Sequence, residues 1–276
     1  MTLGVTGATG QLGGRVARLL AAAGLEQRLL VRSPGRAPQI AGAEVVQASY
    51  ADHDACRRAL DGVDVLLMVS AAEAADRLDQ HRAFVDAAAD AGVRHVVYTS
   101  FLAAAPDATF TLGRDHYATE QHLEASGMAW THLRDNFYAD VFPLFADDTG
   151  VLRGPAGDGR VSAVVRDDVA EVAGAVLRDP GTHEGRRYDL TGPEAFTLAE
   201  AAATMTRLLG QEYSFHDETL EEAHASRSSY GAPDWEVAAW VSTYTSIASG
   251  ELSQVSDDVQ RLLGRPPRSL ADLLSR

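Results

Sequence analysis

Three glycines near the start of the chain are spaced for binding a phosphate group. Gly7, Gly10 and Gly13 follow an apolar run at 3–6 and precede a run rich in alanine and leucine. In a strand–turn–helix unit, these glycines allow a tight turn, the approach of a pyrophosphate to the backbone and close packing of the helix on the sheet. The first N–H groups of the helix then face the phosphates. The sequence therefore predicts a nucleotide site, although G-x-x-G-x-x-G differs from the usual G-x-G-x-x-G and a turn without a ligand is the alternative.

The second strand indicates which nucleotide binds. NAD-selective sites place Asp or Glu about twenty residues after the glycines, where it binds the ribose 2′-hydroxyl. Here the segment contains Arg32 and Arg36 and no acidic residue. A guanidinium is always charged and can bind a phosphate through two hydrogen bonds. The sequence therefore favours NADPH (NADP) over NAD(H), with Arg32 and Arg36 at the 2′-phosphate. The alternative is that one or both arginines only solvate a surface loop, and this alternative is stronger for Arg36 than for Arg32.

These residues need a sheet and helices to position them. Continuous apolar runs alternate with helical patterns, which is typical of a parallel sheet covered on both faces. We expect an α/β fold, a doubly wound Rossmann parallel sheet with a smaller, mostly helical C-terminal substrate domain. The expected domains are residues 1–150 for NADP(H) binding and 151–276 for the remaining sheet elements and the substrate region, intertwined at an approximate boundary. Strands are expected near 2–6, 27–31, 44–48, 63–69, 94–100 and 129–133, and helices near 11–23, 52–60, 76–91 and 113–126.

Local signals also predict how two later helices begin. Asp168 with Glu171, and Thr197 with Glu200, fit the capping-box pattern. Asp179-Pro180-Gly181 is expected to end the first of these helices.

Composition excludes several kinds of chemistry. The formal net charge of −15 argues against a nucleic-acid surface, and no apolar run approaches the length that crosses a membrane. All 24 basic residues are arginine, so Schiff-base chemistry on lysine is excluded. The single cysteine, Cys56, cannot form a disulfide within the chain. The histidines lack H-x-x-H spacing, so no metal site is expected. A cytoplasmic enzyme is the expectation.

An aromatic segment follows the sixth expected strand. Phe137, Tyr138 and Phe142 lie where a doubly wound fold binds its ligand, beyond the carboxyl ends of the strands. Such side chains would suit a flat, apolar substrate. A second aromatic group at 230–244 is interpreted as core more readily than as pocket.

Six motifs in order carry a family resemblance. They are Gly7-Ala8-Thr9-Gly10-Gln11-Leu12-Gly13, Val31-Arg32-Ser33-Pro34, Tyr98-Thr99-Ser100, Leu133-Arg134-Asp135-Asn136-Phe137-Tyr138, Gly154-Pro155-Ala156-Gly157-Asp158-Gly159 and Arg166-Asp167-Asp168-Val169-Ala170. Together they resemble the atypical, NmrA-like short-chain dehydrogenase/reductases, and within them the bacterial type 2 NAD(P)H:quinone oxidoreductases. The resemblance implies a Rossmann domain, NADPH as cofactor and hydride transfer to a quinone. It places the 2′-phosphate on Arg32 and the nicotinamide end on Asn136, Phe137 and Tyr138. The remaining cofactor residues that it implies are Gly7, Ala8, Thr9, Gly10, Gln11 and Leu12 for the pyrophosphate, and Ser70 and Ala71 for the nicotinamide ribose.

The catalytic candidates depart from the ordinary short-chain pattern. Those reductases use Tyr-x-x-x-Lys, whereas this chain has Tyr117 followed by Gln121 at the lysine position. Ser100 occupies the region of the carbonyl-binding serine. His116 is a candidate proton donor, because an imidazole titrates near neutral pH, and a satisfied surface histidine is the alternative. Alcohol oxidation is disfavoured, whereas quinone reduction tolerates the loss of the Tyr–Lys pair.

Two function classes stay open from the sequence. The first is a reductase of a quinone or a similar flat carbonyl or azo compound. The second is a non-catalytic NADP(H)-sensing regulator of the NmrA-like type, which would need a protein partner. Neither class involves nucleic acid or membrane here, and the sequence leaves a homodimer open.

Overall fold

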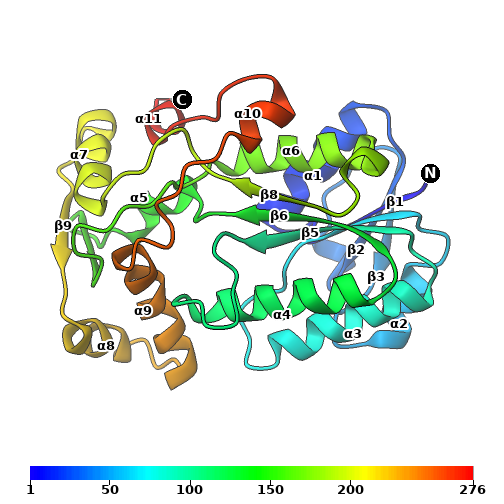
Figure 1. The fold of residues 1–276 in the computed structure, drawn as a ribbon, viewed down its shortest axis with the longest axis horizontal. Coiled ribbons are helices and arrows are strands. Elements are labelled where there is room, and N and C mark those ends of the chain that lie inside the picture. Colours follow the sequence, from blue (N-terminus) through cyan, green and yellow to red (C-terminus); the bar gives the residue numbers. More distant parts are fainter. Residues whose placement is uncertain (276) are drawn as a thin grey trace. The chain divides into compact units, whose positions relative to one another are not determined.

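A seven-stranded sheet organises the described part of the chain. The structure is a computed structural model, and it describes residues 1–275. The strands lie in the order β3-β2-β1-β4-β5-β6-β8, and the pairs from β3 to β5 are parallel (Figure 1). Their bounds are β1 (Leu3–Thr6), β2 (Gln27–Val31), β3 (Ala43–Gln47), β4 (Val65–Met68), β5 (His95–Phe101), β6 (Ala129–Asp135) and β8 (Arg186–Leu190).

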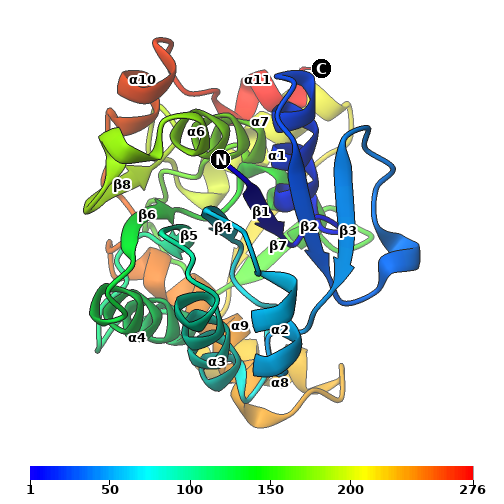
Figure 2. The ribbon, with the colours of Figure 1, turned by 90° about the vertical axis from the view of Figure 1, so that its right-hand side faces the viewer.

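Helices cover both faces of this sheet. Figure 2 shows α1 (Gln11–Ala22) and α6 (Arg166–Arg178) on one face, and α2 (His53–Ala59), α3 (Arg77–Asp90) and α4 (Thr111–Ala125) on the other. Every residue of β1, β4 and β5 is buried, as expected for central strands between two helical layers. The predicted doubly wound, Rossmann-like architecture is confirmed.

The chain divides into two compact units, each made of several segments. The first unit comprises residues 1–100, 115–134 and 169–188. The second comprises residues 101–114, 135–168 and 189–276. Besides the ends of shared elements, the second unit contains α5 (Phe142–Phe145), β7 (Val151–Gly154), α7 (Leu198–Leu209), β9 (Ser214–Asp217), α8 (Leu220–Ser228), α9 (Asp234–Ala248), α10 (Asp258–Leu263) and α11 (Leu270–Leu274).

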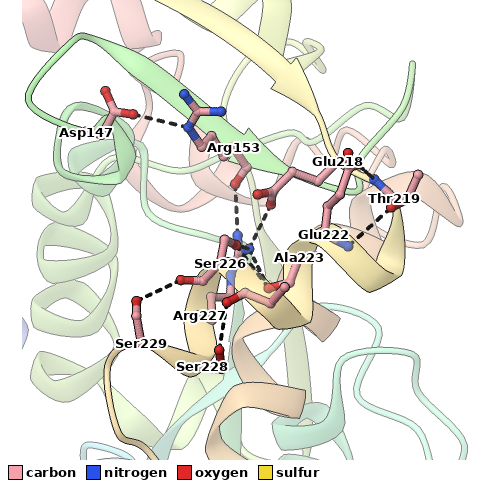
Figure 3. Close-up of polar contacts among 11 residues, drawn as sticks. Asp147, Arg153, Glu218, Thr219, Glu222, Ala223, Ser226, Arg227, Ser228 and Ser229 are labelled. Carbon is pink, nitrogen blue, oxygen red and sulfur yellow. Dashed lines mark hydrogen bonds and ion pairs between the residues drawn. The ribbon is translucent and has the colours of Figure 1, made fainter.

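Within the second unit, the buried side chain of Arg227 connects α8 to β7 and to Glu218, the residue that follows β9. The guanidinium of Arg227 donates to the Glu218 carboxylate at 2.8 Å and to the Arg153 carbonyl at 2.9 Å (Figure 3). It also lies 5.0 Å from the ring centre of Tyr244. A capping box of Thr219 and Glu222 begins α8. The mostly helical region is thus held by specific polar contacts as well as by its apolar core.

All of the expected strands and helices are present in the structure. The six expected strands and four expected helices are present with ends shifted by at most two residues. The short strands β7, β8 and β9 were not predicted. The Thr197–Glu200 capping box and the end of α6 at Arg178 are confirmed.

The predicted capping role of Asp168 is wrong. Helix α6 begins at Arg166, whose backbone N–H donates to the Asp140 carboxylate at 2.9 Å. Asp168 is fully buried and accepts hydrogen bonds from Arg265 at 2.7 Å and from the Arg268 backbone at 2.7 Å. Its position in the sequence fits a cap, but two arginines about a hundred residues later in the chain bind its carboxylate.

Among the described residues, no helix is both long and apolar enough to cross a bilayer.

Candidate nucleotide-binding and reduction site

The glycine turn after β1 has the shape that its spacing predicts. Gly7 adopts a φ of +64°, and the Gly10 N–H donates to the Gly7 carbonyl at 2.8 Å. A Cβ added to Gly13 would lie 2.5 Å from the Gly7 carbonyl and the Thr6 oxygen. Only glycines therefore allow α1 to approach the turn this closely.

The N-terminus of α1 fits an anion. Gly10 is its N-cap residue, no side chain caps the helix in the described structure, and the first turn carries no acidic residue. The leading N–H groups and the positive end of the helix dipole are thus directed at whatever lies in front of the turn. Gln11 has its side chain engaged by Arg15 at 2.8 Å, so Gln11 can offer the nucleotide its backbone N–H. The turn fits the pyrophosphate of NAD(P)H.

Two arginines stand beyond the end of β2 without protein partners. Arg32 follows the last residue of that strand, and Arg36 ends the short 3₁₀ helix Pro34–Arg36. Both side chains are exposed, and within residues 1–275 neither guanidinium has a hydrogen-bond or ion-pair partner. Two free positive charges at this place fit the additional phosphate of NADP(H).

Ser70 and Ala71 form the loop that follows β4. The Ser70 N–H donates to Thr99 Oγ1 at 2.9 Å, and the Ala71 N–H donates to His81 Nε2 at 2.8 Å. The Ala71 carbonyl accepts from Arg77 Nε at 3.0 Å. Buried side chains therefore fix the backbone of this loop.

The hydroxyl groups of Ser100 and Tyr117 differ in their hydrogen bonding. Ser100 donates its hydroxyl proton to Glu120 Oε1 at 2.5 Å, and Arg134 donates to both oxygens of the same carboxylate, at 2.9 and 2.6 Å. Tyr117 is half-buried, and the described residues give its hydroxyl no hydrogen-bond partner. Of the two, Tyr117 is therefore the one with a hydroxyl free to serve a substrate.

His116 is a buried neutral imidazole. The Arg77 guanidinium can only donate, so His116 Nε2 accepts at 2.9 Å, and Nδ1–H donates to the Tyr98 hydroxyl at 3.0 Å. Burial, with Arg77 nearby, lowers the pKa of His116 well below its ordinary value. The environment argues against the predicted proton donation by His116, because its nitrogens are engaged and its charged form is strongly disfavoured.

Asn136 shapes the segment after β6. Its Nδ2 donates to Ser162 Oγ at 2.9 Å and to the Leu252 carbonyl at 3.0 Å, and its Oδ1 accepts from the Phe137 N–H at 2.8 Å. Asn136 is only 1% exposed, and both the nitrogen and the oxygen of its carboxamide have protein partners. The family resemblance implies that the nicotinamide end lies near Asn136, and a side-chain contact with it would compete with these bonds.

Phe137 and Tyr138 differ from Phe142 in their surroundings. Phe137 is half-buried and packs against Phe101, with ring centres 5.0 Å apart. Tyr138 is half-buried too, and the Arg166 guanidinium lies 4.6 Å from the centre of its ring. Phe142 is only 1% exposed within the core of the second unit, so it offers almost no surface to the predicted substrate.

Asp135, at the end of β6, is a polar residue that the sequence did not single out. Its Oδ2 accepts from the Tyr138 hydroxyl at 2.8 Å, whereas its buried Oδ1 has no partner in the described structure. Burial raises the pKa of Asp135 to about 8. An acidic residue as the last residue of a largely buried strand, in Leu133-Arg134-Asp135, was the available signal.

One cluster has the composition of a metal site. Ligand atoms of Glu120, Glu124 and His132 lie within 4.8 Å of one another, a grouping that the sequence spacing did not reveal. However, Arg134 already binds Glu120, and Arg187 binds Glu124 at 2.5 Å. Because arginine neutralises both carboxylates, the cluster is accounted for without an ion.

The match to known proteins covers nearly the whole chain. Residues 7–180 match the model of a family described as NAD(P)H-binding. The chain belongs to this NAD(P)H-binding family. It is 34% identical to quinone oxidoreductase 2 of Escherichia coli, over 99% of this chain and 97% of that protein. It is also 34% identical to the NAD(P)H azoreductase of Xenophilus azovorans, over 97% of this chain and 95% of that protein.

The NmrA-like assignment is confirmed as well. An NmrA-like family domain-containing oxidoreductase of Aspergillus flavus is 31% identical over 95% of this chain and 90% of its own length. The crystal structure of the E. coli quinone oxidoreductase QOR2 with NADPH superposes with a TM-score of 0.90, at 34% identity, over 100% of this chain and 99% of that one. The protein is an NAD(P)H-dependent oxidoreductase with a Rossmann fold.

Proposed function

We propose that the protein is an NADPH-dependent reductase that transfers hydride to a quinone or a similar flat carbonyl or azo substrate. The observation that carries the proposal is the Arg32 guanidinium, which follows β2 in a segment without an acidic residue and has no side-chain partner among residues 1–275. It supports a cofactor with a 2′-phosphate, and a quinone reductase with bound NADPH is among the relatives.

Residues of the first unit would hold the cofactor. The backbone of Gly7 through Leu12 takes the pyrophosphate, Arg32 with Arg36 takes the 2′-phosphate, and the Ser70–Ala71 loop takes the nicotinamide ribose. When bound, NADPH supplies a hydride and leaves as NADP⁺.

The aromatic segment of the second unit would take the substrate. Phe137 is half-buried beside Phe101 and Phe110, which gives a flat ligand an aromatic face to contact. The names of two relatives, a quinone oxidoreductase and an azoreductase, fit substrates of this shape.

The proton requirement of the reaction is modest. A quinone that gains a hydride becomes a hydroquinone anion, and one proton on its oxygen completes the product. Of Tyr117, Ser100 and His116, we take Tyr117 as the donor, because its hydroxyl has no hydrogen-bond partner among residues 1–275. Water can supply the same proton, so the reaction does not depend on a Tyr–Lys pair.

The test is the rate of NADPH oxidation, followed by nicotinamide absorbance, with para-benzoquinone present and the uncatalysed rate subtracted. NADH in a parallel sample tests cofactor preference. We expect quinone-dependent loss of NADPH that is faster than that of NADH. NADPH binding without turnover on quinones or azo dyes would contradict the reductase proposal.

The Ser100–Glu120 hydrogen bond favours a second candidate, a non-catalytic NADP(H) sensor. The serine expected to bind a carbonyl is engaged by a carboxylate, and exposed Gln121 replaces the catalytic lysine. A sensor would bind NADP(H) tightly, leave quinones unreduced and bind a protein partner in a nucleotide-dependent manner. The same assay distinguishes it from the enzyme.

A further inference from the structure

The backbone of the Ser70–Ala71 loop is held by three buried side chains. Arg77 is 3% exposed, His81 is 0% exposed and Thr99 is 2% exposed. Between them they bind the Ser70 N–H, the Ala71 N–H and the Ala71 carbonyl at 2.8 to 3.0 Å. In an ordinary surface loop, water would satisfy these groups. Here side chains of the protein fix the position and the orientation of the consecutive peptide groups at Ser70 and Ala71.

The hydrogen-bond directions fix the state of His81. A backbone N–H can only donate, so His81 Nε2 must accept, and the ring proton must sit on Nδ1. Nδ1–H then donates to Thr119 Oγ1 at 2.8 Å, and Thr119 donates to the Asp115 carbonyl at 2.7 Å. Burial, together with Arg77, lowers the pKa of His81 to about 3, in keeping with a neutral ring. The chain of bonds therefore runs in one direction, from Ala71 to helix α4.

Arg77 connects the same loop to α4 by a second route. Its Nη1 forms an ion pair with Asp115 at 3.3 Å, and its Nη2 donates to His116 Nε2 at 2.9 Å. Asp115, His116 and Thr119 surround Tyr117 in the sequence of α4. The loop after β4 and the helix that carries Tyr117 are thus fixed to each other by Arg77 and His81.

This loop borders the glycine turn. Strand β4 pairs with β1, and a Cβ added to Gly7 would lie 3.0 Å from the Cβ of Val69. The Val69 N–H also donates to Thr6 Oγ1 at 2.9 Å. The fixed peptide groups at Ser70 and Ala71 therefore lie next to the glycine turn, at the carboxyl ends of the strands, where a doubly wound sheet binds a nucleotide.

We propose that Arg77 and His81 are positioning residues, which hold the Ser70–Ala71 loop in its nucleotide-binding conformation before the cofactor binds. The same two side chains fix the position of this loop relative to α4. The inference rests on the proposed binding of NADPH. Neither side chain needs to touch the cofactor; each acts through the backbone that it binds. Preorganisation of this kind improves affinity because the loop loses no further freedom on binding.

The first experiment compares the NADPH dissociation constants, by fluorescence titration, of the wild-type protein, His81→Leu, His81→Gln and His95→Leu. His95 is a matched control, since it is buried and hydrogen-bonds to Thr131 at 2.8 Å without contacting the loop. We expect His81→Leu to bind NADPH about 10-fold more weakly, because the Ala71 N–H loses its acceptor. The Gln variant keeps an acceptor and should stay within about threefold of the wild type, like the control.

Turnover supplies a readout that a general loss of stability would not give. With quinone as acceptor, His81→Leu should raise the KM for NADPH more than it lowers kcat. Equal NADPH affinity for the wild type and a folded His81→Leu would overturn the inference. Failure of the wild type to bind NADPH would instead overturn the proposed function.

A measurement on the wild-type protein keeps the inference testable if His81→Leu does not fold. Amide hydrogen exchange of a peptide that covers Ser70 and Ala71 should be slow without NADPH and change little when NADPH is added. Fast exchange that slows only on addition of NADPH would show that the cofactor, and not Arg77 and His81, orders the loop.

Discussion

The Ser100 hydroxyl donates a 2.5 Å hydrogen bond to the carboxylate of Glu120, which is completely buried on helix α4. Arg134 binds both oxygens of that carboxylate from β6. The strand residue that resembles a catalytic serine therefore takes part in joining β5, α4 and β6. In the adjacent Tyr117–Gln121 pattern, the tyrosine hydroxyl has no hydrogen-bond partner among the described residues.

This relationship predicts a large loss of stability for Glu120→Ala. Removing the carboxylate deletes the buried acceptor to which both the Arg134 guanidinium and the Ser100 hydroxyl donate. We expect the free energy of unfolding to fall by about 3 kcal/mol, measured by urea denaturation at neutral pH. As a control, Arg82→Ala removes an exposed ion pair with Asp79 and should cost less than about 1 kcal/mol. Similar values for the two variants would show that the buried pair is not a major support of the fold.

The unpartnered arginine predicts the cofactor preference. Arg32→Glu should weaken NADPH binding far more than NADH binding, because only NADPH carries the phosphate that a new carboxylate would repel. Loss of a charge-assisted hydrogen bond alone corresponds to about 1.5–3 kcal/mol, or roughly a 10- to 100-fold increase in the NADPH dissociation constant. Fluorescence titration with both nucleotides measures this effect. Equal weakening of the two would contradict the assignment of the 2′-phosphate to Arg32.

The buried carboxyl of Asp135 predicts a dependence of stability on pH. Its folded-state pKa is raised to about 8, above the ordinary value near 3.9 of an unfolded chain. Between these values the folded state holds a proton that the unfolded state lacks. The contribution of Asp135 to stability is therefore greatest at acidic pH and falls as pH rises through this window, with a slope approaching 1.4 kcal/mol per pH unit.

The measurement compares the free energy of unfolding of the wild type and Asp135→Asn from pH 5 to pH 8. Asn cannot ionise, so the difference between the two proteins should shift in favour of the variant as pH rises. The groups that face Asp135, namely Tyr138 with Arg166 and Asp140 beside it, are present in both proteins. A difference that is constant with pH would show that Asp135 is already ionised in the folded state.

The sequence by itself determined the central sheet, the glycine turn and the position of Arg32. Those features depend on short-range physics: apolar runs of strand length, a turn that only glycine allows, and a charged residue placed by the end of its strand. The helix boundaries around them followed from the same local signals. The family resemblance then linked the motifs to NAD(P)H.

Only the tertiary structure decided which polar side chains are free. Ser100, His116 and Asn136 resemble site residues in sequence, yet folding brings Glu120, Arg77 and Ser162 to them, and their hydrogen-bonding groups are used within the protein. Arg77 and His81 carried no signal in the sequence, but their helix places them beneath the loop after β4, where they bind its backbone. These pairings join residues far apart in the chain, and a buried polar group binds whichever partner the packing supplies, so no local pattern could have foretold them.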